Sequence, residues 1–456
     1  MIRLSVSLKG SHGTLRTMLD SDLANAIKLA HRSLLLVAKG VGERHAVKRM
    51  AAADPSLASS RGRALDLVVG TIREQDTLDR IVQLVLTDQN ISVRNLQAFR
   101  LAAHLMLSLG DKSAAIETRR ALRSLVSSEH APDLELLLGS LQQPDLSRLS
   151  QGEDELVRVG LNTHHPVWWV EYCFRLFGRG QAIELLSSPS RPRYIRVNPL
   201  RNRGKYSLPI HAKAMSNMLR QVSLKHGIYS LQGPLSTFSQ FFAQGLFQIQ
   251  DLASFLAIKA ADPKPGERVL DLCAAPGAKT TTLAQLMRNR GQIISVDYSR
   301  SRMETWKRET ARLGVKIGEP LIGDVNDLGV HEEFDLVVID PPCTGTGVFD
   351  RNPSMKWHLS PESLRKYAIL QRRFLNSASR LVKENGRILY CTCSVTLEEN
   401  EAMISSFLKT HPEFETRPII KEYGSPGLHG LSDCRRFYPN RDGTAGYVVS
   451  LMQRMA

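Results

Sequence analysis

The sequence lacks the long apolar run that a membrane-spanning helix needs. Its first ten residues, M-I-R-L-S-V-S-L-K-G, are too interrupted by polar and charged side chains to form the apolar centre of a secretory signal. Cysteine is scarce, with six residues in the chain, which argues against a disulfide framework. Cys391 and Cys393 form a C-x-C pair without a second pair, so no zinc site is expected. These absences predict a soluble protein of the reducing cytoplasm, without membrane contact.

Acidic residues are missing from a long central stretch. None occurs between Leu185 and Gln250, whereas nine basic residues do: Arg191, Arg193, Arg196, Arg201, Arg203, Lys205, Lys213, Arg220 and Lys225. A segment whose charges all have one sign repels itself unless a polyanion is near. The pattern therefore favours a surface that contacts a nucleic-acid backbone over a merely solvated face. At 456 residues and 42% hydrophobic content, the chain is long enough for two or three domains.

The first 150 residues carry apolar side chains at three-to-four spacing, which is typical of helices with one buried face. The clearest such segments are Ser21 to Val37, Ala64 to Val82 and Asn95 to Leu107. They predict an all-α domain over residues 1–150. Its role stays open, because a helical bundle can bind RNA or can serve only for packing and protein contacts.

The stretch from Arg268 to Lys279 predicts a strand, a tight turn and a helix. Val269 to Leu272 is an apolar run suited to a buried parallel strand, and a helical segment extends from Lys279 to about Met287. Small residues in the turn let the backbone approach a ligand at the carboxyl end of the strand. We therefore expect a nucleotide-type ligand, bound by Cys273, Ala274, Ala275, Pro276, Gly277, Ala278 and Lys279. An ordinary strand-to-helix turn is the alternative.

Three further apolar segments each lead to an acidic residue. Gly291 to Val296 leads to Asp297, Leu321 and Ile322 lead to Asp324, and Phe334 to Ile339 leads to Asp340. Asp297 stands about twenty residues past the small-residue turn, where such folds place a carboxylate on a ribose hydroxyl pair. A single acidic residue at a strand end is usually a helix cap. A series of them along one sheet edge instead favours a binding site.

Four separated motifs resemble those of one family. D-L-C-A-A-P-G-A-K-T, V-D-Y-S-R-S-R, D-P-P-C-T-G-T-G-V and Y-C-T-C-S-V-T-L-E-E-N are similar to the motifs of the NOL1/NOP2/Sun family of RNA cytosine-5 methyltransferases, in the family's order. The resemblance extends from about His165 to the C-terminus. It implies S-adenosylmethionine as the cofactor, with Arg302 and Lys279 completing its site and Ala278 replacing the usual second glycine.

The resemblance also implies an α/β fold in three domains. A doubly wound, Rossmann-like sheet is expected over residues 246–456, after a small basic subdomain of the RNA-recognition-motif type over residues 160–245. The N-terminal helices are similar to the NusB-like RNA-binding domain of the bacterial Sun-type members. Such an attachment favours ribosomal small-subunit RNA as the substrate, with tRNA as the alternative, and we expect a monomer.

Methylation of cytosine carbon 5 needs a nucleophile, because that carbon is too weakly nucleophilic until a group adds to carbon 6. A cysteine thiolate suits this step, since it attacks well and can leave again. Cys343 after Pro342 and Cys393 after Thr392 both follow predicted strands and compete for the role. The resemblance assigns the attack to Cys393 and a part in product release to Cys343. Asp340 can hold the base near ring nitrogen 3.

Other interpretations belong to different classes of protein. The two cysteines could be buried structural residues, although both stand in loops past strand ends, where active sites are built. The chain could be an RNA-binding ribosome-assembly factor with an inactive core, or a DNA methyltransferase that uses Cys343. Cys391 is interpreted as a strand-end residue without a catalytic role. The loop that holds Lys356 and Trp357 could close over the substrate.

Overall fold

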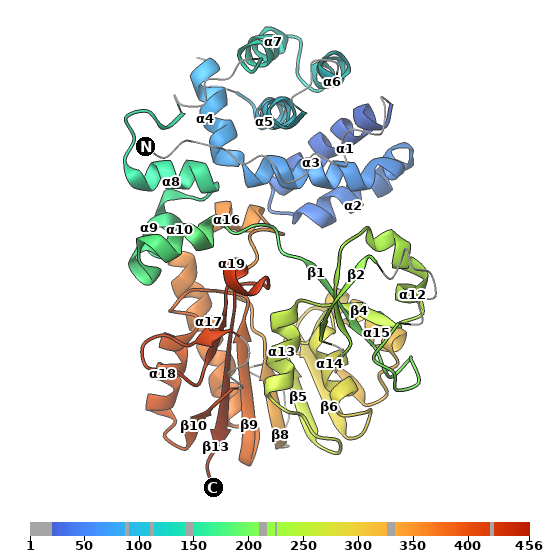
Figure 1. Cartoon of the computed structure of the whole chain (residues 1–456), viewed down its shortest axis with the longest axis vertical. Helices are drawn as coiled ribbons and strands as arrows, with labels where there is room; N and C mark the ends of the chain where they lie inside the picture. The colour runs from blue at the N-terminus through green and yellow to red at the C-terminus, as the bar shows by residue number, and fades with distance from the viewer. Residues whose placement is uncertain are drawn as a thin grey trace. The chain divides into compact units, whose positions relative to one another are not determined.

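The computed structural model describes residues 21–86, 91–109, 114–142, 149–208, 217–223, 226–325, 333–419 and 424–456 (Figure 1). The chain forms two compact units, which we call the helical unit and the sheet unit. The helical unit comprises Met1–Ser187 together with Phe349–His358, and the sheet unit comprises Ser188–Val348 together with Leu359–Ala456. Among the described residues, no helix is long and apolar enough to cross a membrane. The predicted division into three domains stays a prediction.

The helical unit consists of α-helices, and those up to Ser140 share one apolar core, as the periodicity predicted. Its helices are α1 (Ser21–Val37), α2 (Glu43–Ala53), α3 (Arg61–Arg73), α4 (Gln75–Val85), α5 (Val93–Leu109), α6 (Ala114–Arg123), α7 (Ala131–Ser140), α8 (Glu155–Thr163), α9 (Val167–Phe177), α10 (Arg179–Leu186) and α16 (Ser354–His358), with a 3-10 helix η2 (Pro55–Ser60). In α1, Ile27, Ala30 and Leu34 are fully buried at the expected spacing. The predicted bounds of α1 are correct.

The predicted helix from Ala64 to Val82 is wrong, because the structure has two helices there. α3 ends at Arg73 and α4 begins at Gln75, with Glu74 between them at φ −98° and ψ 14°. Glu74 is held in this position by a 2.8 Å contact between its carboxylate and His104 Nδ1. Apolar spacing continues across the break, so the sequence pattern gives no sign of it.

The sheet unit begins with a small antiparallel sheet in the order β2-β3-β1-β4. Its elements are β1 (Arg193–Val197), β2 (Leu219–Ser223), β3 (Ile228–Leu231) and β4 (Phe247–Ile249), with η5 (Leu235–Phe238) and α12 (Ser239–Ala243) beside them. Ile195, Leu231, Phe238 and Phe247 form its apolar core. This sheet lies within the residues predicted to form the small basic subdomain, which stays a prediction.

A nine-stranded sheet forms the rest of the sheet unit, in the order β11-β12-β13-β9-β8-β5-β6-β7 with β10 paired to β13. The strands are β5 (Arg268–Leu272), β6 (Gln292–Asp297), β7 (Gly318–Ile322), β8 (Phe334–Ile339), β9 (Val382–Thr392), β10 (Phe414–Arg417), β11 (Ser425–Pro426), β12 (Arg435–Phe437) and β13 (Tyr447–Arg454). β5 to β9 pair in parallel, whereas β13 is antiparallel to β9. The predicted doubly wound, Rossmann-like sheet is thus confirmed.

Helices cover both faces of this sheet (Figure 1). They are α13 (Leu252–Ala260), α14 (Ala278–Leu286), α15 (Arg300–Leu313), α17 (Pro361–Ser379) and α18 (Glu401–Thr410), and a short helix α19 (Pro439–Asp442) precedes β13. Alternate strand residues enter two cores: Val269 packs with α13 and α14, whereas its neighbour Leu270 packs with α17 and α18. Strand order reverses between β5 and β8, which are neighbours. Ligands of such sheets bind beyond the strand ends at this point.

Candidate active site

The strand register brings the predicted site residues to one edge of the sheet. Leu272 of β5 is paired with Val296 of β6 and with Ile339 of β8. The next residues along these strands are Cys273, Asp297 and Asp340, so they form one row at the carboxyl ends. Cys393 follows the end of the neighbouring strand β9, and Asp324 lies two residues past β7 with its side chain exposed.

The small-residue turn after β5 is packed tightly against α15. Ala274 and Ala275 are buried against Met303 and Trp306. Gly277 directly precedes α14 at φ +109°, and a Cβ atom there would lie 3.2 Å from Trp306 Cδ1. Both the positive φ and the close approach favour glycine at this position. Burial raises the pKa of the Cys273 thiol, which is therefore protonated and serves as a small neutral side chain of the turn.

Asp297 is 2% exposed and only partly satisfied by the protein. Its Oδ1 accepts a 3.0 Å hydrogen bond from the Ser299 N–H. Its Oδ2 lies 3.3 Å from Arg302 Nη2 but accepts no hydrogen bond from any residue that the structure describes. Arg302 donates instead to the Ala275 carbonyl in the turn. A buried carboxylate oxygen without a donor suits a ligand that carries hydroxyl groups.

Asp340 forms an ion pair with Lys279, the last predicted residue of the turn. Burial by itself lowers the pKa of Lys279, but the carboxylates of Asp340 and Asp271 outweigh it and raise that pKa above its ordinary value. Tyr447 of β13 donates to Asp340 Oδ1 over 3.5 Å. Sequence reasoning missed this tyrosine, because only the sheet topology places β13 beside β9.

The two motif cysteines meet. Cys343 Sγ and Cys393 Sγ are 3.2 Å apart, although 50 residues separate them in the chain. The hydrogen bond with Cys393, burial and the carboxylates of Glu399 and Asp340 raise the pKa of Cys343 well above its ordinary value. Cys343 is therefore held as a thiol, whose S–H can donate to Cys393. All six cysteines of the chain are free.

Cys391 is fully buried inside β9. Its sulfur accepts a 3.3 Å hydrogen bond from the Tyr447 hydroxyl, and burial raises its pKa to about 12. This environment fits the interpretation of Cys391 as a residue without a catalytic role, which stays a prediction.

The basic residues of the acid-free stretch divide into two groups. Arg196 is 1% exposed and donates to Gln250, Gln285 and Thr281, so it joins the small sheet to α14. Arg191 pairs with Asp251, and Arg201 donates to the carbonyls of Ala311 and Arg312. Four further basic residues of the stretch are exposed, namely Arg193, Arg203, Lys205 and Arg220, whereas Lys213 and Lys225 lie outside the described residues. The excess charge is thus only partly available to a polyanion.

The loop that was predicted to close over a substrate instead packs within the helical unit. Lys356 is 2% exposed and belongs to the helical unit, where it donates to the carbonyls of Arg73 and His164. Trp357 donates to the Ile72 carbonyl over 2.6 Å and packs on the helical core. These contacts use both side chains for packing within the helical unit.

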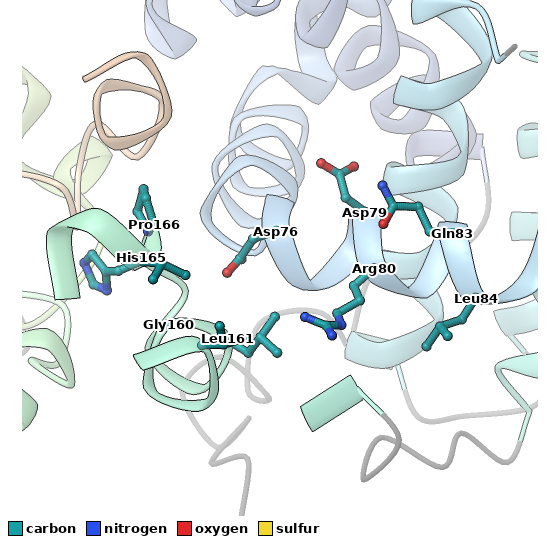
Figure 2. Close-up of a pocket in the computed structure, with 11 residues that line it drawn as sticks. Asp76, Asp79, Arg80, Gln83, Leu84, Gly160, Leu161, His165 and Pro166 are labelled. Carbon is teal, nitrogen blue, oxygen red and sulfur yellow. The ribbon is translucent and has the colours of Figure 1, made fainter. Parts of the chain in front are cut away.

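The helical unit also contains a pocket of about 430 Å³ (Figure 2). α4 contributes Asp76 and Arg80 to it, and the segment that joins α8 to α9 contributes His165 and Pro166. None of the predicted site residues lines this pocket. The predicted site residues therefore lie at the sheet edge and not at this pocket.

The family model described as 16S rRNA methyltransferase RsmB/F matches residues 258–453. The probable ribosomal RNA small subunit methyltransferase B of Bacillus subtilis is 29% identical over 87% of this chain and 91% of its own length. A tRNA (cytosine(72)-C(5))-methyltransferase of Pyrococcus horikoshii is 30% identical over 53% of this chain and 61% of its own length.

Among solved structures, the crystal structure of the protein PH0851 is similar to this chain with a TM-score of 0.79. It is 28% identical, and the match covers 94% of this chain and 99% of that protein. A methyltransferase homologue from Pyrococcus horikoshii matches with a TM-score of 0.57 at 28% identity, over 66% of this chain and all of that one.

Proposed function

Because the chain belongs to the NOL1/NOP2/Sun family of RNA cytosine-5 methyltransferases, we propose that it methylates carbon 5 of a cytosine in small-subunit ribosomal RNA. It is an S-adenosylmethionine-dependent enzyme. The observation that supports the proposal is the 3.2 Å approach of the Cys343 and Cys393 sulfurs, because two thiols so close together can act as nucleophile and hydrogen-bond donor, and the Asp340 carboxylate is near enough to help raise the pKa of Cys343.

Residues at the ends of β5 and β6 fit the cofactor. S-adenosylmethionine, when bound, supplies an electrophilic methyl group. Asp297 is assigned to the ribose hydroxyls, because its Oδ2 is buried without a donor among the described residues. The turn from Cys273 to Ala278 is assigned to the cofactor because its small residues leave the backbone accessible. Arg302 holds this turn through the Ala275 carbonyl, and exposed Asp324 is assigned to the same ligand.

Cys393 is assigned the attack on carbon 6 of the cytosine. The thiolate forms the sulfur–carbon bond, and the ring's electron pair makes carbon 5 nucleophilic. Asp340 with Lys279 holds the edge of the base that gains electron density. After methylation, a water molecule takes the carbon 5 proton, the ring double bond re-forms, and the electron pair of the sulfur–carbon bond returns to Cys393. The Cys343 thiol donates a hydrogen bond to this departing sulfur.

RNA contact is assigned to the exposed basic residues of the small sheet and its loops, Arg193, Arg203, Lys205 and Arg220. We propose three domains in a monomer of the cytoplasm: a NusB-like domain over 1–150, a subdomain of the RNA-recognition-motif type over 160–245 and the methyltransferase domain over 246–456. Six free cysteines support a reducing compartment.

One observation favours ribosomal RNA over tRNA. The Bacillus subtilis relative, named for small-subunit ribosomal RNA, matches 87% of this chain, whereas the tRNA-modifying relative matches 53%. The larger match must include most of the helical unit. A shared domain outside the catalytic sheet supports a shared RNA substrate.

Transfer of label from S-adenosylmethionine tests the proposal. The purified chain is incubated with small-subunit ribosomal RNA or with tRNA, and bisulfite sequencing then locates any 5-methylcytidine. We expect one modified position in ribosomal RNA and none in tRNA. Modification of tRNA alone would select the alternative substrate. Absence of transfer to either RNA, together with tight RNA binding, would indicate an assembly factor with an inactive core.

A further inference from the structure

Two loops carry the active-site cysteines, and one buried carboxylate joins them. The Cys343 loop comprises residues 343–348 after β8, and the Cys393 loop comprises residues 393–400 after β9. Glu399 belongs to the second loop and is fully buried, as are Thr344 in the first loop and Ser394 and Thr396 in its own. None of these residues has a role in the mechanism so far.

Five hydrogen bonds converge on the Glu399 carboxylate. Oε1 accepts from the Thr344 N–H at 2.8 Å and from Gln371 Nε2 at 2.9 Å. Oε2 accepts from the hydroxyls of Thr344 at 2.5 Å, Ser394 at 2.5 Å and Thr396 at 2.8 Å. All five donors are neutral. Burial of a carboxylate that contacts no cation costs free energy unless hydrogen bonds fully satisfy it. So costly an arrangement suggests a specific role for Glu399.

The contacts with Thr344 cross from one cysteine loop to the other. Thr344 follows Cys343 directly, and both its backbone N–H and its hydroxyl bind Glu399. Gln371 of α17 donates to Glu399 and also to the carbonyl of Pro342, on the other side of Cys343. The backbone on both sides of Cys343 is thereby tied to one carboxylate of the Cys393 loop.

Glu399 differs in this respect from its two neighbours. Asn400 donates to the carbonyls of Ser394 and Thr396, within its own loop. Glu401 pairs with Arg436, which donates to the carbonyl of Val395. Among the described residues, neither of these two side chains forms a hydrogen bond with the Cys343 loop, whereas Glu399 contacts both loops.

We propose that Glu399 is a positioning residue that sets the separation of the two catalytic sulfurs and keeps Cys343 as the hydrogen-bond donor during product release. The proposal rests on the roles assigned to Cys343 and Cys393 above. Its electrostatic part has independent support, because the negative charge of Glu399 contributes to the raised pKa of Cys343. A thiol at position 343 can donate to the departing sulfur, whereas a thiolate cannot.

Two threonines form a matched pair for the test. Thr344 and Thr396 are both fully buried, both donate to Glu399 Oε2, and both contact the Ser394 hydroxyl, at 3.2 Å and 2.9 Å. They differ in that Thr344 belongs to the other cysteine loop. Thr344→Val and Thr396→Val each remove one hydroxyl and keep the side-chain shape. A purely structural role of the hydroxyls predicts equal effects.

The first readout is the covalent RNA–protein complex during turnover, measured on denaturing gels. In Thr344→Val we expect kcat to fall about tenfold and the complex to accumulate about fivefold or more, with kcat/KM for RNA and cofactor unchanged, because only a step after methyl transfer is slowed. Thr396→Val should change each quantity less than about twofold. Equal accumulation in the two variants, or a fall in kcat without accumulation, would overturn the proposal.

A second variant covers the case in which Thr344→Val is too unstable to assay. Glu399→Gln keeps the size of the side chain and removes its charge, which lowers the pKa of Cys343. The alkaline limb of the kcat–pH profile should therefore move to lower pH in Glu399→Gln and stay in place in Thr396→Val. An unchanged limb in Glu399→Gln counts against the proposal.

A third measurement needs no methyl transfer, so it separates failure of this inference from failure of the proposed function. Diamide removes two hydrogen atoms from two thiols, is reduced to its hydrazine and leaves one disulfide. Mass spectrometry follows formation of the Cys343–Cys393 disulfide in the protein alone. We expect it to form at least about five times more slowly in Thr344→Val than in Thr396→Val. Equal rates would refute the positioning role even if the native enzyme methylates RNA.

Discussion

The two halves of the sheet edge differ in how completely the protein satisfies their carboxylates. On the cofactor side, Asp271 in β5 and Asp297 in β6 are both buried, and each has an oxygen without a hydrogen bond from the described residues. On the cysteine side, Glu399 is equally buried and accepts five hydrogen bonds. Burial alone therefore does not distinguish binding residues from positioning residues.

The two kinds of residue differ in whether hydrogen-bond donors of the protein occupy all of their buried carboxylate oxygens. An acceptor left open inside a protein has a cost that a ligand can remove, so it marks a place where a partner from outside is expected. An acceptor with a full set of internal donors holds the groups that donate to it. The same distinction divides the basic residues, since Arg196 is saturated inside the protein and Arg203 is exposed.

The largest effect is expected at the cysteines. Cys393→Ala should reduce methyl transfer at least about ten-thousandfold, because it removes the nucleophile. Cys343→Ala also removes a thiol, but it should trap the covalent RNA complex, because the departing sulfur loses its hydrogen-bond donor. Label transfer and denaturing gels measure the two outcomes. If Cys343→Ala formed no complex while Cys393→Ala kept its turnover, the two roles would have to be exchanged.

The next effect concerns Asp271 and stability. Burial raises its pKa to about 7, against the lowering effect of the hydrogen bond from Thr280. The folded state thus keeps a proton that the unfolded state loses above about pH 4, so this group's contribution to stability is full at low pH and lost as pH rises to 7.

Asp271→Asn should remove this pH dependence of the free energy of unfolding. The dependence amounts to up to about 4 kcal/mol between pH 4 and pH 8. Urea unfolding at several pH values measures it. Asp335→Asn serves as the control with the opposite sign, because burial raises the pKa of Asp335 but its hydrogen bonds from Arg268 and Lys383 lower it overall. Parallel pH curves for the native chain and Asp271→Asn would show that the open oxygen of Asp271 carries no such cost.

A smaller effect is expected for cofactor binding. Asp297→Asn should weaken S-adenosylmethionine about ten- to a hundredfold, because an amide replaces a charged acceptor, and should leave RNA binding unchanged. Glu319→Gln in the adjacent strand β7 is a control, since Glu319 is exposed and accepts from Gln292. Calorimetric titration with the cofactor measures both variants. Equal affinities for the native chain and Asp297→Asn would remove Asp297 from the cofactor site.

The smallest effect is expected at the exposed basic residues. Replacing Arg203 and Lys205 together by Ala should weaken RNA binding about three- to tenfold at moderate salt and reduce its salt dependence, because phosphate contacts are lost. Lys264→Ala, which removes an exposed lysine from another part of the unit, should leave both quantities unchanged. Filter binding at several salt concentrations measures them. An unchanged salt slope in the double variant would place the RNA elsewhere.

Much of the fold was predictable from local pattern. The strand from Phe334 to Ile339 has the predicted bounds, and β5 and β6 begin and end within one residue of them. Buried parallel strands are continuous apolar runs, so their ends are visible in the sequence. The break at Glu74 was not predictable, because a contact with His104, 30 residues away, holds it.

Several contacts of the site were not predictable either. The motif that contains Glu399 was apparent, but nothing in it indicates that the carboxylate reaches Thr344 in another loop. Nor does the charge of the acid-free stretch indicate that the Arg196 guanidinium is buried and donates its hydrogen bonds to side chains of α14. The contacts of Lys356 and Trp357, which were interpreted as part of a loop over the substrate, were likewise not predictable from local pattern. Their hydrogen-bond partners lie about 190 to 290 residues earlier in the chain.

The sequence by itself determined which reactive groups the protein has and that each follows a strand, because strand periodicity and motif spacing are local properties of the chain. Only the tertiary structure decided which of these groups meet and which carboxylates are left open. Pairing of β5, β6, β8 and β9 brings together residues far apart in sequence, and the number of donors around a buried oxygen depends on all the segments that surround it.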